Sequence, residues 1–263
     1  MSRRRILNIT SRKKQDTMLT WSNTTAANPT NGATYASVPA VLVGGQTYVF
    51  PWCATARDND LVAGTEGNIF DTATRTATEC YMVGLKERVQ IQTNSGMPWQ
   101  WRRICFTIKG NDLPAATTAT MKLFAETSAG IQRLLNNVQT SALNGVINNL
   151  VFKGTDGGDW NNYFNAKTDT RRVTIMYDKT TSIRSGNTNG IMREYKRWHR
   201  MGKMLVYDDE EAGGGVSPDY LSTVGRRGMG DYYVLDIISA GSGSTSSDVM
   251  TVNPQSTLYW HER

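Results

Sequence analysis

Residues 79–93 read Glu-Cys-Tyr-Met-Val-Gly-Leu-Lys-Glu-Arg-Val-Gln-Ile-Gln-Thr, and this stretch decides the fold class. Its later apolar residues, Leu85, Val89 and Ile91, are separated by polar ones. A repeat of two is typical of a β-strand that buries one face. The stretch therefore predicts a long, half-buried strand.

The residues on either side extend the β pattern. Residues 94–98, Asn-Ser-Gly-Met-Pro, have turn chemistry, and 99–109 alternate imperfectly, which predicts a hairpin partner with one bulge between Trp101 and Ile104. Residues 47–53 predict another strand, in which Pro51 indicates a bend or a sheet edge.

The rest of the chain predicts further strands separated by turn-rich loops. Between residues 115 and 151 the helical spacing of Ile131, Leu134, Leu135 and Val138 predicts a short helix inside a long connection. Loops rich in glycine, serine or aspartate are expected at 154–158, 208–215 and 240–247. The remaining strands are expected at 17–21, 146–153, 171–178, 195–207, 231–238 and 249–260.

Many strands, few helices and connections of uneven length predict a single all-β sandwich or barrel. A jelly-roll β-sandwich of about eight strands, with long inter-strand loops and at most short helices, fits best. An immunoglobulin-type sandwich fits less well, because it needs shorter, more regularly spaced strands. The chain divides into a basic N-terminal arm, residues 1–16, and a jelly-roll domain, residues 17–263.

The positive charge of the chain lies at its N-terminus. Lys and Arg number 29 against 23 Asp and Glu, a net charge of +6. Residues 1–14 hold six of these basic residues and no acidic one, so the remaining chain is neutral. A basic arm on a neutral domain favours contact with an anionic polymer, and a nuclear import signal or a solubilising tail are the alternatives. The six candidate residues are Arg3, Arg4, Arg5, Arg12, Lys13 and Lys14.

A second basic segment, residues 193–203, reads Arg-Glu-Tyr-Lys-Arg-Trp-His-Arg-Met-Gly-Lys. Basic groups can bind phosphates while aromatic rings stack on unpaired bases. The alternative is a surface strand whose aromatic residue packs in the core. In a strand, one face would hold Lys196, Trp198 and Arg200, and the other Arg197, His199 and Met201. The candidate secondary nucleic-acid contacts are Lys196, Arg197, Trp198 and Arg200.

Motifs for catalysis or metal binding are absent from the sequence. There is no phosphate-binding loop, nucleophile elbow or zinc-protease motif. Three widely spaced cysteines and two histidines provide neither a disulfide framework nor a zinc site. The acidic run at 208–211 offers oxygen ligands for a divalent cation, but beside three glycines it is expected to be a solvated loop. We therefore expect no enzymatic activity, cofactor or metal.

No part of the sequence predicts insertion into a membrane or export. The mean hydropathy is −0.44, and no apolar run approaches the roughly 18 to 20 residues needed to cross a bilayer. The N-terminus lacks the apolar core of a secretory signal. The protein is expected to work inside a cell or a particle.

Four blocks of sequence resemble the capsid protein of genomoviruses, the gemycircularvirus group. They lie at the start, middle and end of the chain, and the Pro-Trp-Gln-Trp-Arg-Arg block is the most specific. The blocks are residues 3–19, 84–93, 98–106 and 258–260.

The resemblance implies a jelly-roll coat protein, similar in plan to geminivirus and circovirus coats. Such a protein self-assembles into a T=1 icosahedral shell of about sixty copies around circular single-stranded DNA. It also implies that the basic arm faces the genome and binds host nuclear import receptors. The expected locations are the virion and, during assembly, the host nucleus.

Two other functions stay open at this point. One is a β-sandwich carbohydrate-binding module with exposed Trp and Tyr as sugar platforms, which leaves the N-terminal charge unexplained. The other is a cellular single-stranded DNA-binding protein that uses residues 193–203.

Overall fold

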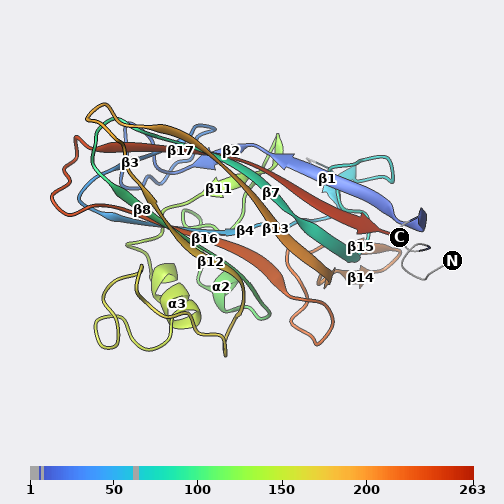
Figure 1. The fold of residues 1–263 in the computed structure, drawn as a ribbon. Helices are drawn as coiled ribbons and strands as arrows, with labels where there is room; N and C mark the ends of the chain where they lie inside the picture. The colour runs from blue at the N-terminus through green and yellow to red at the C-terminus, as the bar shows by residue number, and fades with distance from the viewer. Residues whose placement is uncertain (1–5, 7–8, 62–64) are drawn as a thin grey trace.

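Two antiparallel β-sheets pack face to face in the computed structural model, which describes residues 6, 9–61 and 65–263 (Figure 1). The five-stranded sheet has the order β1-β17-β7-β13, with β3 also paired to β17. The four-stranded sheet has the order β12-β8-β16-β4. The five-stranded sheet comprises β1 (Arg12–Met18), β3 (Ala40–Val43), β7 (Glu79–Thr93), β13 (Met192–Val206) and β17 (Val249–Glu262). The four-stranded sheet comprises β4 (Thr47–Cys53), β8 (Trp99–Ile108), β12 (Thr174–Ile183) and β16 (Asp231–Ala240).

The chain alternates between the two sheets. From β3 it crosses to β4, returns to β7, crosses to β8 and continues into β12 of the same sheet. It then returns to β13, crosses to β16 and ends in β17. This winding of eight antiparallel strands is jelly-roll-like, and the predicted all-β fold class is confirmed.

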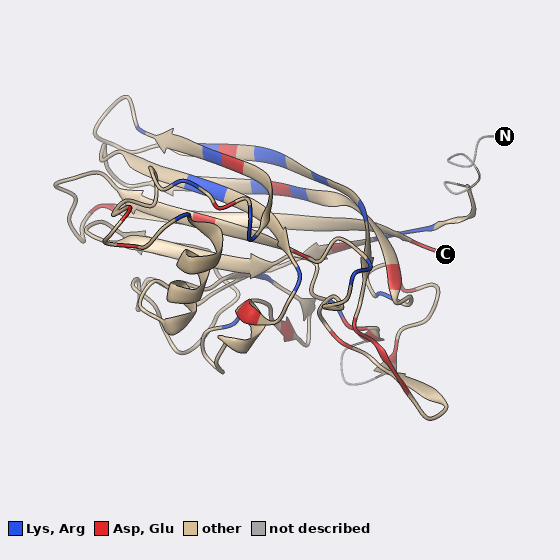
Figure 2. Cartoon of the chain, turned by 90° about the horizontal axis from the view of Figure 1, so that it is seen from below, with Lys and Arg blue, Asp and Glu red and all other residues tan. Residues whose placement is uncertain are grey.

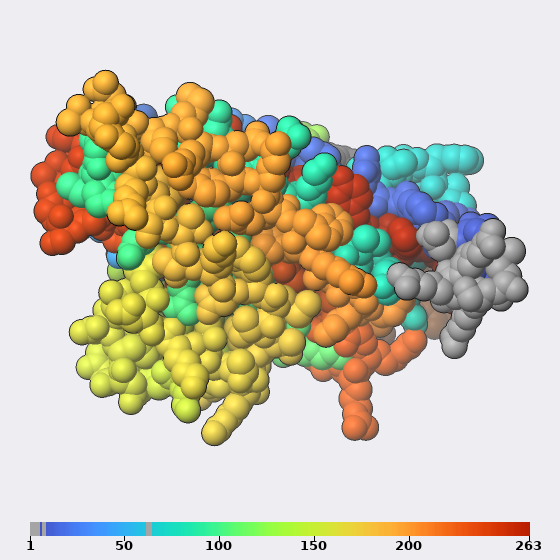
Figure 3. Space-filling view, viewed as in Figure 1, coloured from blue at the N-terminus to red at the C-terminus, as the bar shows by residue number. Residues whose placement is uncertain are grey.

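Most of the long connection between β8 and β12 forms a third layer over the outer face of the four-stranded sheet (Figure 1). Residues 133–135 of the connection lie instead in the core between the two sheets. In the space-filling view the yellow part of this connection covers the lower side, while the orange β13 crosses the upper part (Figure 3). The connection contains α2 (Asp112–Ala115), β9 (Glu126–Thr127), β10 (Gly130–Ile131), β11 (Arg133–Leu135) and α3 (Ala142–Val151). The other short strands are β2 (Thr20–Ser22), β5 (Asp60–Leu61), β6 (Thr65–Glu66), β14 (Glu210–Ala212) and β15 (Gly215–Ser217).

Burial follows this layering. Along β7 the side chains alternate between buried and exposed, because its sheet packs on one face only. Strands β4 and β16 are buried along nearly their whole length, because their sheet packs against the other sheet on one side and the connection on the other. Among the described strands β4 pairs with β16 alone, so Pro51 lies in an edge strand, which is one of the two positions that the sequence predicted for it.

Two predictions around residues 94–109 are wrong. The turn at 94–98 does not form a hairpin, because β7 and β8 belong to different sheets. No bulge separates Trp101 from Ile104, since β8 pairs with β16 without a register shift. The alternation is imperfect because both faces of β8 are buried, which places Arg102 and Arg103 in the interior.

The middle of the chain also differs from the prediction. The strand expected at 146–153 is largely helix α3, whose Leu143, Ile147 and Val151 recur every four residues and pack on the four-stranded sheet. The helix expected around 131–138 is extended instead. Strand β11 pairs in parallel with β2, and all three of its residues are buried. The apolar spacing there came from a fully buried strand, which has no alternation of its own.

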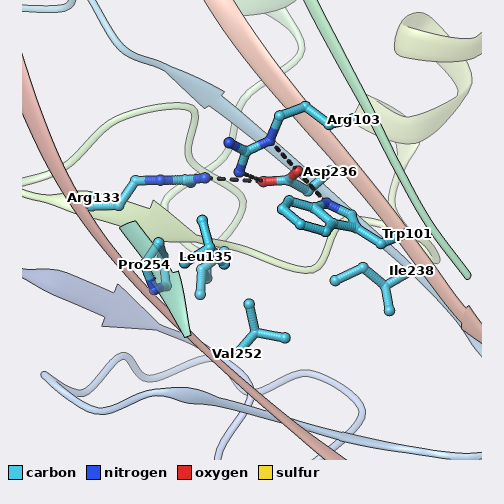
Figure 4. A pocket seen from close by; sticks show the side chains of 9 residues that line it. Trp101, Arg103, Arg133, Leu135, Asp236, Ile238, Val252 and Pro254 are labelled. Carbon is cyan, nitrogen blue, oxygen red and sulfur yellow. Dashed lines mark hydrogen bonds and ion pairs between the residues drawn. The ribbon is translucent and has the colours of Figure 1, made fainter. Parts of the chain in front are cut away.

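A buried cluster of two carboxylates and two guanidinium groups joins the two sheets. Figure 4 shows three of its members, Arg103, Arg133 and Asp236. Glu87 of β7 binds Arg103 of β8, and its other oxygen lies 2.9 Å from Nε of Arg133 in β11. Asp236 of β16 lies 2.7 Å from Nε of Arg103 and 2.9 Å from Nη2 of Arg133. The two negative and two positive charges balance, so the cluster is neutral. All four residues are at most 3% exposed, so it is also closed to solvent.

Neighbouring side chains complete the hydrogen bonding of this cluster. Trp101 donates from Nε1 to Asp236 at 2.7 Å, and Ser256 donates to Glu87 at 2.7 Å. The guanidinium of Arg133 lies over the ring of Trp52, 4.3 Å from its centroid. Buried charges are stable only when paired and hydrogen-bonded in this way.

Replacing Glu87 with Gln should lower the free energy of unfolding by about 3–5 kcal/mol, because two buried guanidinium groups lose their shared anion. Urea unfolding followed by circular dichroism measures the loss. The control is Lys86→Ala, one residue away on the exposed face of the same strand, which should change stability by no more than about 0.5 kcal/mol. Equal stability of the two variants would contradict a structural role for the cluster.

Candidate nucleic-acid interface

The structure separates the six basic residues of the predicted N-terminal arm. Arg3, Arg4 and Arg5 lie outside the described residues. Strand β1 begins at Arg12, so the end of the expected arm is part of the five-stranded sheet. Arg12 and Lys13 are exposed.

Lys14 was expected to contact nucleic acid, but it lies in the interior of the protein. Its side chain is buried, and Nζ lies 3.3 Å from Glu262. The same group donates to the carbonyl of Thr74 at 2.7 Å and to the hydroxyl of Thr76 at 3.0 Å. Lys14 therefore anchors β1 to β17 and to the loop before β7, and its charge is already neutralised.

The second basic segment lies in β13, at one edge of the five-stranded sheet. Lys196, Trp198 and Arg200 are exposed on the outer face, while His199 is buried, as the two-residue repeat predicts. Arg197 is half-buried, and its guanidinium lies 5.7 Å from the ring centroid of Trp101. The four predicted contacts thus divide into three on the outer face and one on the inner side.

Strand β7 brings two further basic residues beside them. Lys86 is directly opposite Trp198, and Arg88 is directly opposite Lys196. Figure 2 shows Lys and Arg positions side by side on two neighbouring strands at the top of that view. We call the outward-facing set the basic-aromatic face: Lys86, Arg88, Lys196, Trp198, Arg200 and Tyr259.

The charges of this face are mostly uncompensated. Within the described part of the chain, no acidic side chain pairs with Lys86, Arg88 or Arg200. Lys196 has one exposed partner, Glu194, at 3.4 Å. Like charges directly opposite each other on paired strands destabilise a sheet. The pairing of Arg88 with Lys196 therefore favours an anion from outside the chain.

Trp198 is 51% exposed, and its ring lies so close to the β7 backbone at Gly84 that only a glycine fits there. A Cβ at Gly84 would come within 2.8 Å of the Trp198 ring and 2.6 Å of the His199 carbonyl oxygen. The ring of Tyr259 in β17 lies 5.9 Å away, tilted by 57°. The alternative that this tryptophan packs in the core is wrong, because its ring is half exposed.

An exposed indole between cationic side chains suits a single-stranded nucleic acid. Phosphates can bind the Lys and Arg groups while an unpaired base stacks on the ring. Such contacts hold the polymer without reading its sequence, because phosphates are the same in every nucleotide.

Sequence reasoning missed Lys86, Arg88 and Tyr259 as members of this face. The alternation in 79–93 did contain a signal, since Lys86 and Arg88 flank Glu87 and share the face opposite to it. The position of Lys86 and Arg88 beside β13 could not be found from the sequence, because β13 lies about a hundred residues after β7 along the chain.

The buried ion cluster is a second concentration of titratable groups, and it has no room for a ligand. The space beside Arg103, Arg133 and Asp236, shown in Figure 4, does not admit a water molecule. Burial alone would raise the pKa of Glu87, but the charges of Arg103 and Arg133 lower it to about 2. Burial and the charge of Arg103 lower the pKa of His199 to about 4. The role of this cluster is therefore to hold the sheets together.

The described part of the chain contains no group of three His, Cys, Asp or Glu side chains arranged to hold a metal. Across the same residues, no helix has the length and apolar character to cross a bilayer. The three cysteines are buried thiols, and burial raises the pKa of Cys105 to about 12.

Comparison with known proteins found no family model that matches the chain. It also found no curated protein with significant similarity. The resemblance to genomovirus coats consequently stays a prediction.

We expect His199 to make the fold sensitive to acid. Its pKa is about 4 in the folded chain against an ordinary 6.5, so the unfolded chain takes up this proton first as the pH falls between those values. His199→Gln removes this effect. As the pH falls from 6.5 to 4, the native chain should lose stability that the variant keeps. The difference between their free energies of unfolding should grow by about 1.4 kcal/mol per pH unit, up to about 3 kcal/mol in favour of the variant.

Urea unfolding at a series of pH values measures this difference. Burial raises the pKa of Asp231 to about 6, so protonation of Asp231 stabilises the folded chain as the pH falls, opposite to the effect of His199. The variant and the native chain must therefore be compared at each pH. A difference that does not change with pH would contradict the assignment to His199.

Replacing Lys86, Arg88 and Lys196 together with Ala should weaken binding of single-stranded DNA and reduce its salt dependence. Loss of three phosphate contacts should reduce the slope of log K against log salt by about 2. Trp198→Ala should cost about 1–3 kcal/mol of affinity with little change in that slope, because it removes stacking only. Fluorescence anisotropy with a labelled oligonucleotide measures both.

The matched control replaces Lys153, Lys167 and Lys179 with Ala, which changes the net charge equally at exposed positions elsewhere. Equal effects of the two triple variants would show that overall charge, and not this face, binds the DNA.

Proposed function

We propose that this chain is a structural coat protein that self-assembles into a closed icosahedral shell around circular single-stranded DNA. The basic N-terminal residues and the basic-aromatic face contact the genome. In this proposal the chain has no catalytic role, and its partners are other copies of itself, the DNA and host import receptors.

The observation that carries the proposal is the difference between the two sides of the sandwich. One outer face is covered by the connection between β8 and β12 and contributes to the core. The other outer face carries Lys86, Arg88, Lys196 and Arg200 around an exposed tryptophan. A subunit with one cationic side can enclose a polyanion on that side and leave the opposite side for the exterior.

The resemblance in four blocks of the sequence supports the same assignment. The strand pairing of the two sheets gives a jelly-roll-like winding, which is the architecture that this resemblance implies. The neutral remainder of the chain also fits assembly, because copies without a large net charge can pack with little mutual repulsion.

The first experiment is to determine particle size by light scattering and negative-stain imaging of the purified chain. We expect uniform closed shells. Absorbance at 260 and 280 nm on the same fraction reports nucleic acid, and the signal at 260 nm should fall when residues 1–11 are deleted and Lys86, Arg88 and Lys196 are replaced by Ala. The deletion ends before β1 begins and leaves the sheet intact.

A stable monomer of 29.2 kDa at all salt and pH conditions would overturn the coat proposal. If that monomer binds single-stranded DNA through Trp198, the alternative of a DNA-binding module is correct. If closed shells form and their DNA content is the same after Lys86, Arg88 and Lys196 are replaced by Ala, the genome contact lies elsewhere on the subunit.

A further inference from the structure

A groove opens in the five-stranded sheet beside the basic-aromatic face. Strand β17 pairs with β3 through residues 249–252 and with β1 through residues 256–262. Among the described strands, none pairs with residues 253–255 on that side, and an open groove of about 450 Å³ lies there. This volume is within the about 300–1,000 Å³ typical of small-molecule sites.

Pro254 explains why the sheet can be open at this point. Proline has no backbone N–H, so a missing partner strand leaves no donor unsatisfied. The carbonyl of Pro254 accepts a hydrogen bond from the hydroxyl of Thr20. The backbone is thus satisfied without a strand, and the groove offers its side chains rather than a strand edge.

Amide groups and apolar side chains line the groove together. Asn253 and Gln255 are exposed, and neither amide has a hydrogen-bonding partner within the described part of the chain. Leu19 is 52% exposed and Val38 is 39% exposed, and both border the groove. Apolar walls with a few polar groups suit a flat ring that carries donors and acceptors on its edge.

Two sets of residues that lie directly opposite one another on paired strands connect the basic-aromatic face with the groove. One set runs from Lys196 through Arg88 to Gln255. The adjacent set runs from Trp198 through Lys86 and Thr257 to Thr17, which lines the groove. One strand spacing, about 4.8 Å, separates the backbone at Arg88 from that at Gln255. A polymer whose phosphates bind Lys86 and Arg88 therefore has its next unpaired base beside the groove.

We propose that this groove binds one unpaired nucleobase of the single-stranded DNA that crosses the basic-aromatic face. Asn253 and Gln255 donate to and accept from the edge of the base, while Leu19 and Val38 contact its ring. The inference rests on the proposed function, since it assigns a base site to the surface that holds the phosphates. It also gives this face two places for bases, a stacking platform at Trp198 and the groove on the other side of Lys86 and Arg88.

The test compares two labelled strands of equal length, one an ordinary oligodeoxynucleotide and one composed of abasic sites. Replacing Asn253 and Gln255 together with Leu removes both amides from the groove. This double variant should bind the ordinary strand about tenfold more weakly, since hydrogen bonds to a base are lost. Its affinity for the abasic strand should equal that of the native chain, because the phosphate contacts remain.

Gln15→Leu is the matched control. Gln15 is exposed on the same sheet and does not line the groove, so this variant should bind both strands as the native chain does. Circular dichroism and light scattering on each sample monitor folding and association.

Unchanged affinity of the double variant for the ordinary strand would overturn the base site. An equal loss on both strands would also overturn it, since it would show a general effect on charge or folding. If the double variant alters association while DNA binding is unchanged, the groove is a contact between copies. Failure of the native chain to bind either strand would refute the proposed function itself.

Discussion

The fold depends on the buried pairing of Glu87 and Asp236 with Arg103 and Arg133. Each carboxylate contacts both guanidinium groups, and the four side chains come from strands of both sheets and from the long connection. Burying four charges is costly unless every one is paired, so the cluster stabilises only one mutual arrangement of these strands. It therefore contributes to specificity of register as well as to cohesion.

The same short sequence provides the core and the candidate site. In Lys86-Glu87-Arg88 the central carboxylate faces inward to the ion cluster, and the two flanking cations face outward. Because side chains in a strand alternate between faces, a register that places Glu87 correctly also places Lys86 and Arg88 beside β13. Pairing the acid internally leaves the outer face with an excess of positive charge, which attracts an external polyanion.

Sequence reasoning located most strands of the two sheets, including the fully buried β4 and β16, and failed in the long connection between β8 and β12. The strand at residues 79–93 was predicted with its observed bounds, and the two-residue repeat predicted that Lys196, Trp198 and Arg200 share one face of their strand. In contrast, residues 131–151 were assigned the wrong elements. The apolar spacing of 131–138 suits a helix although β11 is a fully buried strand, and the four-residue repeat of Leu143, Ile147 and Val151 in α3 was missed. Lys14 also escaped the prediction, since nothing near it in sequence indicates that Glu262 is its partner.

The amino-acid sequence by itself determined the all-β class, the concentration of positive charge near the N-terminus, and the faces of the exposed strands, because composition and local periodicity are properties of neighbouring residues. Only the tertiary structure decided that β7 lies between β13 and β17, and that Arg88 faces Lys196. The same holds for the opening in the sheet at Pro254. Strand pairing depends on backbone hydrogen bonds and burial between segments that are far apart along the chain, and no local pattern specifies which segments meet.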